Sequence, residues 1–146
     1  MKEYVLRRFF EGESGPAELE ADYPGTVSQE SDVGGTPVRR FHFEPMSVDF
    51  DVTSSHILKL VDAMSAGSLR PETLKAVCFC LEATDHFLWD ADTPDGERVA
   101  DAIFWIGTPE INYPLTPGVL SKIRHYLLTG EKQLSTADTK VRRAGA

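Results

Sequence analysis

The chain has 146 residues, a formal net charge of −8 and 41% hydrophobic residues, which fits one globular domain and excludes a disordered chain. An acidic balance argues against a nucleic-acid binder, because phosphate contacts require a basic surface. No apolar run approaches the roughly 20 residues that span a membrane. Glu3, Arg7 and Arg8 interrupt the N-terminus where a secretory signal needs an apolar core. We therefore predict a cytoplasmic protein that binds neither membranes nor nucleic acid.

The first third of the chain predicts β-structure. Tyr4–Phe10 and Val38–Glu44 are short runs rich in aromatic and β-branched residues. From Met46 to Val52, apolar and polar residues alternate with the period of a half-buried strand. Pro45 cannot donate to a β-ladder, so a bend at this residue would join the last two runs into one strand.

Residues 11–36 separate the first two predicted strands. This segment holds seven acidic residues, five glycines, two prolines and no Lys or Arg. A connection of this length is unusual in a compact domain, and such loops are either functional or mobile. We predict a mobile acidic loop.

From residue 53 onward, apolar residues recur at helical spacing and predict four helices. Pro is favoured in the first turn of a helix and Gly just after its end, so these residues mark the limits. The first helix ends near Gly67, the second begins around Pro71, the third ends at Gly107, and the fourth runs from Thr116-Pro117 to Gly130.

Together these elements predict an α+β fold, in which a small antiparallel N-terminal sheet packs against about four C-terminal helices. One globular domain should span residues 1–130. The tail 131–146, with Lys132, Lys140, Arg142 and Arg143, should fray. The second and third helices carry Phe79, Phe104 and Trp105 off their main apolar face, which predicts that both helices are central to the core.

Cys78 and Cys80 lie in the second predicted helix, where their side chains point about 200° apart and cannot bridge each other. Structural zinc needs four ligands, and no second Cys pair is present. We interpret both residues as buried free thiols, which suits a reducing compartment.

The acidic stretch WDADTPDGE, residues 89–97, resembles a calcium loop at first sight. Counted from Asp90, however, the fifth position of an EF-hand loop would be Pro94, and the required glycine comes one residue late. A helix start accounts for the same residues, with Thr93 as N-cap and Pro94 in the first turn. We therefore predict a cap and no metal.

Four histidines, His42, His56, His86 and His125, are scattered through the chain. A nucleophilic site needs a Ser or Cys within reach of a His and an orienting acid. The sequence contains no nucleophile-elbow pattern and no phosphate-binding loop. We favour a non-enzymatic protein without a cofactor; the alternative is a small enzyme whose His, Cys and Asp residues meet only in the folded chain.

Acidic residues are concentrated between positions 85 and 101, with Arg98 as the only base. A solvated helix face is one interpretation of this stretch. The other is a recognition surface, in which the acids steer a basic protein partner and an exposed aromatic, Phe87 or Trp89, anchors it. The candidate partner-binding residues are Asp85, Phe87, Trp89, Asp90, Asp92, Asp95, Glu97 and Asp101.

The run TPEINYPLT, residues 108–116, is followed by a short helix and resembles segments of small acidic bacterial immunity-type proteins. The resemblance covers at most residues 55–130. It implies a non-enzymatic, protein-binding role, such as neutralising a basic toxin, and assigns no functional residue. An adaptor role and a homo-oligomer both remain open. Within the run, Asn112 and Tyr113 are suited to bonding backbone groups of the loop.

Overall fold

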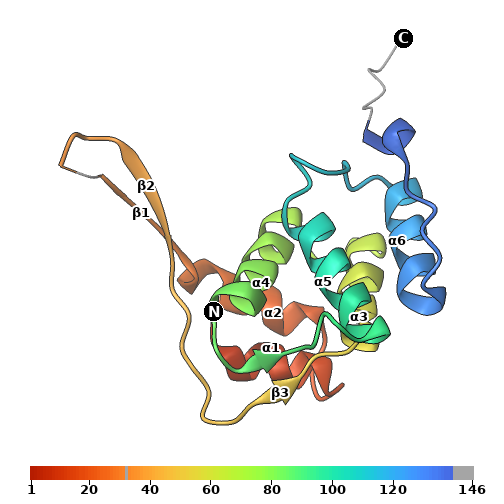
Figure 1. Ribbon diagram of the computed structural model, residues 1–146. Helices are drawn as coiled ribbons and strands as arrows, with labels where there is room; N and C mark the ends of the chain where they lie inside the picture. Colours follow the sequence, from red (N-terminus) through yellow and green to blue (C-terminus); the bar gives the residue numbers. More distant parts are fainter. Residues whose placement is uncertain (32, 140–146) are drawn as a thin grey trace.

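The computed structural model describes residues 1–31 and 33–139, which form an α+β structure as the sequence predicted. Figure 1 shows a helical body from which one β-hairpin projects. The elements in chain order are α1 (Glu3–Phe10), α2 (Pro16–Asp22), the 3-10 turn η1 (Tyr23–Gly25), β1 (Val27–Ser31), β2 (Pro37–Phe41), β3 (Phe50–Asp51), α3 (Ser54–Ser65), α4 (Pro71–Ala83), β4 (Phe87–Leu88), α5 (Pro94–Gly107), α6 (Pro117–Thr129) and the 3-10 turn η2 (Thr136–Thr139).

The predicted strand Tyr4–Phe10 is wrong, because these residues lie in helix α1. Val5, Leu6, Phe9 and Phe10 are buried, and their spacing of one, three and one residues is that of a helix face. The aromatic and β-branched composition favoured a strand, but burial of this face against the other helices decides the conformation.

The antiparallel sheet is a two-stranded hairpin of β1 and β2, paired from Val27 with Phe41 to Ser31 with Pro37. The segment 11–36, predicted as one loop, contains α2, η1 and β1, so the partner of β2 comes from the acidic segment. At the foot of the hairpin, the Phe41 ring stacks on Phe79 of α4 at a centroid distance of 4.8 Å.

The predicted bent strand from Val38 to Val52 is also wrong. Strand β2 ends at Phe41, and only Phe50–Asp51 of the later part forms a strand, β3, which pairs in parallel with β4. Met46 and Val52 are buried, as the alternation predicted, but Val48 is exposed.

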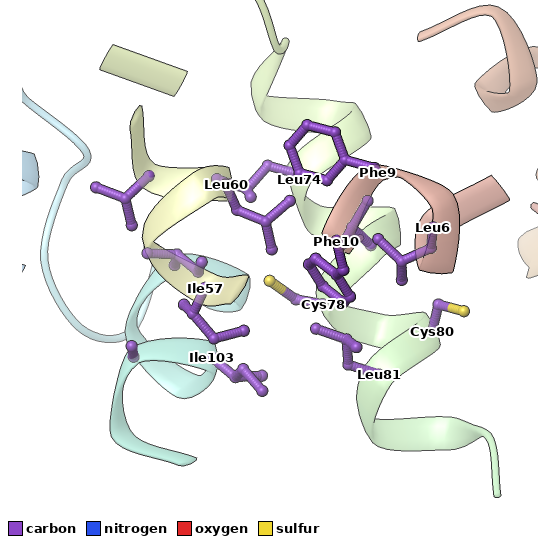
Figure 2. Close-up of a cluster of buried hydrophobic side chains, with 14 of the residues drawn as sticks. Leu6, Phe9, Phe10, Ile57, Leu60, Leu74, Cys78, Cys80, Leu81 and Ile103 are labelled. Atoms are coloured by element: carbon purple, nitrogen blue, oxygen red, sulfur yellow. The ribbon is translucent and has the colours of Figure 1, made fainter. Parts of the chain in front are cut away.

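The four predicted C-terminal helices are confirmed as α3 to α6. The side chain of Thr116 caps α6 by accepting a hydrogen bond from Val119 N at 3.2 Å, and Gly130 ends this helix with φ of 79°, as its C-terminal position predicts. The core brings α1 against the later helices, as Figure 2 shows for Leu6, Phe9, Phe10, Ile57, Leu60, Leu74, Cys78, Cys80, Leu81 and Ile103.

Helix α4 has buried residues on most of its circumference, but Phe79 is not one of them. The exposed fraction is 44% for Phe79 and 48% for Phe104. Trp105 is half-buried, 5.1 Å from the Tyr126 ring by centroids. The sequence therefore predicted the position of α4 correctly and the burial of the two phenylalanines incorrectly.

The segment after α6 packs back onto the body over its described part. Leu134 lies against the core, and Lys122 Nζ is 2.7 Å from Asp138 Oδ1. Lys140, Arg142 and Arg143 lie outside the described residues. Within the described part of the chain, no helix is long and apolar enough to cross a membrane.

Candidate protein-binding surface

The acidic stretch 89–97 folds back on the first turn of α5. The Thr93 side chain accepts a hydrogen bond from Gly96 N at 3.1 Å, and Thr93 Oγ1 donates to the backbone oxygen of Asp90 at 2.7 Å. A Cβ placed on Gly96 would lie 1.7 Å from Asp90 O, so only glycine permits this approach. The predicted helix cap is confirmed, and the glycine of the stretch has a packing role.

Neither cysteine is placed for chemistry. Cys78 and Cys80 are both buried, and burial raises the pKa of Cys78 above its ordinary value and that of Cys80 to about 12. Protonated, buried thiols are poor nucleophiles and poor metal ligands. Over residues 1–31 and 33–139, no group of three or more His, Cys, Asp or Glu side chains could hold a metal ion.

Two of the candidate acids hold the helices together. Asp95, in the first turn of α5, accepts hydrogen bonds from the side chain of Ser54 and from Ser54 N, the latter at 3.1 Å, which joins the starts of α3 and α5. Asp101 accepts a hydrogen bond from the Tyr126 hydroxyl and lies 3.5 Å from Lys132 Nζ. Burial, and then the bond to Asp101, raises the pKa of Tyr126.

The other four candidate acids, Asp85, Asp90, Asp92 and Glu97, are exposed around the β4–α5 corner. Asp90 Oδ1 accepts a hydrogen bond from Asp92 N at 2.9 Å within the turn. Among the residues that the structure describes, none of these four acids forms an ion pair with a base of the chain. We call these four residues the acidic corner.

Phe87, expected as an anchor if exposed, is buried, with an exposed fraction of 3%. Its ring packs edge-on against Phe10 and Phe50, with both centroid distances at 6.2 Å. Trp89 is half-buried and packs against the core. Neither side chain stands free at the acidic corner, so the expected aromatic anchor is wrong for Phe87.

The exposed aromatics lie instead on α4 and α5, which run antiparallel and side by side (Figure 1). Lys75, near the start of α4, binds Glu110, just after the end of α5, with 2.9 Å between Nζ and Oε1. Phe79 on α4 and Phe104 on α5 are both exposed, and the two helices are neighbours. Their position off the main apolar face is the signal in the sequence for this exposure, although helices that are apolar on most sides are usually central.

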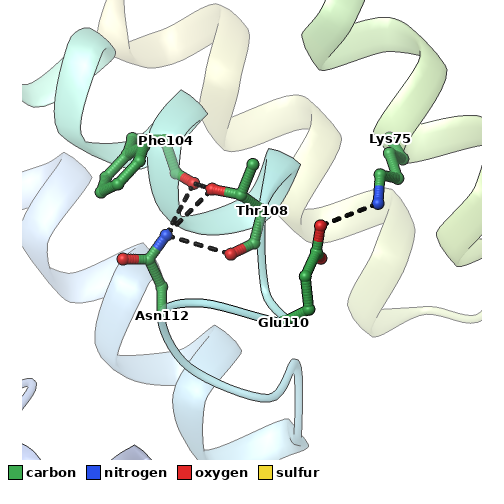
Figure 3. A network of polar contacts seen from close by, with 5 residues as sticks. All are labelled: Lys75, Phe104, Thr108, Glu110 and Asn112. Atoms are coloured by element: carbon green, nitrogen blue, oxygen red, sulfur yellow. Dashed lines mark hydrogen bonds and ion pairs between the residues drawn. The ribbon is translucent and has the colours of Figure 1, made fainter.

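The loop after α5 is fixed by the polar contacts drawn in Figure 3. Asn112 Nδ2 donates to Phe104 O at 3.2 Å, to Thr108 O at 3.0 Å and to Thr108 Oγ1 at 2.9 Å. The prediction that Asn112 bonds backbone groups is confirmed. Tyr113 instead packs its ring edge-on against Trp105, at 6.2 Å between centroids.

The histidines have separate partners. His56 Nδ1 accepts a hydrogen bond from Thr53 N at 2.9 Å, and burial lowers its pKa. His86 Nδ1 is 2.9 Å from Asp49 Oδ1, and this bond raises the pKa of His86. His125 Nε2 lies 3.4 Å from Glu131 Oε2. Within the described residues, no histidine bonds a cysteine.

One serine does meet a histidine. Ser28 Oγ and His42 Nε2 are 2.7 Å apart on the exposed hairpin. A catalytic pair also needs an acid that orients the imidazole and donors that stabilise an oxyanion. In the described part of the chain, no acid bonds His42. This contact is a cross-strand polar pair of the kind that stabilises a hairpin.

No protein-family model, curated protein or solved structure matches this chain.

Proposed function

We propose that this chain is a non-enzymatic module that binds a basic protein, either neutralising a toxin in the manner of immunity proteins or serving as an adaptor. The observation that carries this proposal is the acidic corner. Asp85, Asp90, Asp92 and Glu97 are exposed, and no base among the described residues neutralises them. We also propose a cytoplasmic location, where the free thiols of Cys78 and Cys80 would stay reduced.

Electrostatics makes a basic protein the favoured partner. A protein that handles nucleic acid, such as a nuclease, carries a positive groove for its phosphate substrate. Exposed carboxylates on both sides of the turn between β4 and α5 can enter such a groove. Attraction between the two surfaces accelerates encounter by up to about 10³-fold at low salt, and the effect weakens as salt screens the charges.

The first prediction tests the acidic corner with two double variants of equal charge. Asp92→Lys with Glu97→Lys alters the corner, and Glu11→Lys with Glu13→Lys alters exposed acids before α2. Each Lys adds 2 to the charge, so both doubles change the net charge from −8 to −4. Asp95 stays unchanged because it bonds Ser54.

Immobilised protein is incubated with lysate of the organism that encodes the chain, and retained proteins are identified and titrated. We expect a basic protein that binds wild type and the Glu11/Glu13 double equally. It should bind the Asp92/Glu97 double at least about tenfold more weakly, and its affinity for wild type should fall between about 50 and 500 mM salt. If no basic protein is retained, or if both doubles bind equally at all salt concentrations, the proposal is wrong.

A further inference from the structure

Two large apolar side chains are exposed on adjacent helices. Phe79 on α4 and Phe104 on α5 each leave nearly half of their surface in water. Single exposed apolar residues are common, but exposed apolar groups that gather on one face mark interaction sites. Aromatic side chains supply a large part of the binding energy at protein interfaces.

The two helices are held close at this face. A Cβ placed on Gly107 of α5 would lie 2.8 Å from Cys78 Cβ of α4, so the helices approach without an intervening side chain. A small cavity of about 90 Å³ lies beside this contact, and Phe41, Lys75, Phe79 and Glu82 are among its lining residues. The size of the cavity suits part of one side chain of a partner.

The foot of the hairpin extends the aromatic surface. The rings of Phe41 and Phe43 lie 4.8 and 5.7 Å from the Phe79 ring by centroids. Both rings are half-buried. The Phe79 ring therefore packs against two other rings while nearly half of the residue stays exposed, which offers a partner an apolar platform.

Exposed carboxylates are present on both helices of this face. Glu82 is exposed on α4 and Glu97 on α5. The base at the cavity, Lys75, is already paired with Glu110, as Figure 3 shows. A partner segment would therefore meet an apolar centre with carboxylates on its rim and a neutralised lysine.

We propose that Phe79, Glu82, Glu97 and Phe104, here called the α4–α5 face, form the docking surface for a basic amphipathic helix. This inference rests on the proposed function and names the segment of the basic partner that binds. Apolar side chains of the helix lie on Phe79 and Phe104, and its Lys or Arg side chains reach Glu82 and Glu97. A helix suits the face because a row of apolar side chains with flanking bases is the usual ligand of such a surface.

The second prediction uses a defined probe, a fluorescent peptide of about five helical turns with leucine on one face and lysine on the other. We expect Phe104→Ser and Phe79→Ser to weaken its binding at least about tenfold in an anisotropy titration. Leu128→Ser is the matched control, because Leu128 on α6 has an exposed fraction of 52%. This variant should bind the peptide as wild type does. A peptide of the same composition in scrambled order should bind weakly.

The Phe79 ring stacks on Phe41 of the hairpin, so Phe79→Ser could loosen the hairpin. Among the described residues, Phe104 contacts no other ring, so Phe104→Ser decides the outcome in that case. Circular dichroism checks that each variant is folded. Equal peptide binding by wild type and both Phe variants overturns the inference, and so does absence of binding to wild type at about 100 μM. The proposed function is decided separately, by the lysate experiment with the Asp92/Glu97 double. If the Asp92/Glu97 double loses the captured protein while Phe79→Ser and Phe104→Ser retain it, the partner docks at the acidic corner without the two exposed rings of the α4–α5 face.

Discussion

At the scale of single residues, the contact between His86 and Asp49 is the one whose protonation can be followed most directly. The hydrogen bond to Asp49 raises the pKa of His86 above its ordinary value of 6.5. Asp49→Asn removes the negative acceptor, so we predict a lower His86 pKa in this variant. An NMR titration of the imidazole signals measures the change, and the other histidines serve as the internal reference.

The same contact makes stability depend on pH. A histidine whose pKa is raised by folding stabilises the fold below its unfolded pKa of about 6.5, and this contribution is lost as pH rises through the folded pKa. Asp49→Asn should therefore lower the free energy of unfolding in urea more at about pH 5.5 than at about pH 8.5. An equal loss at both pH values would mean that the charge of Asp49 is not involved.

The residues whose roles could be predicted from the sequence are those that bond groups close to them along the chain. Thr93 as the cap of α5, and Asn112 as a backbone donor, bond groups three to eight residues away. Asp95 has the same local pattern as the other acids of its stretch, yet it bonds Ser54, 41 residues earlier. The sequence locates the acidic residues between positions 85 and 101, but it does not show that Asp95 and Asp101 bond other helices.

At the scale of elements, Gly107 sets the distance between α4 and α5. Because an added Cβ would lie 2.8 Å from Cys78 Cβ, we predict that Gly107→Ala destabilises the protein by about 1–3 kcal/mol through overpacking. Gly118→Ala in the first turn of α6 is the control, since its nearest neighbour would be 4.0 Å away. Thermal unfolding of both variants measures the difference, and equal stabilities would show that the helices separate without cost.

The wrong predictions share one cause, which is packing against segments that are distant in the sequence. Residues 4–10 have strand-like composition, but the position of α1 against α4 and α3 fixes them as a helix. The apolar composition of most sides of α4 predicts a buried Phe79, but its ring packs on Phe41 of the hairpin and the residue is 44% exposed. Propensity is a weak local preference, and packing against distant segments overrides it.

At the scale of the whole molecule, the class of fold could be predicted and the arrangement could not. The four C-terminal helices are amphipathic, and Pro and Gly residues in the sequence mark where they begin and end. The packing of α1 into the helical core and the projection of the β1–β2 hairpin depend on contacts between segments far apart in sequence (Figures 1 and 2). The α4–α5 face arises from that packing, so no single stretch of sequence contains it.

The burial of both thiols in the shared core leads to the last prediction. Cys78 and Cys80 lie on α4 among side chains from α1, α3 and α5, and a buried thiol reacts only when the structure around it opens. Labelling of the two thiols by a disulfide reagent should therefore follow the urea unfolding curve measured by tryptophan fluorescence. Ser65→Cys, at the exposed end of α3, is the control and should label at once without urea. Equally rapid labelling of either natural thiol in the native protein would show that α4 opens independently, and the α4–α5 face would then be a mobile surface instead of a rigid one.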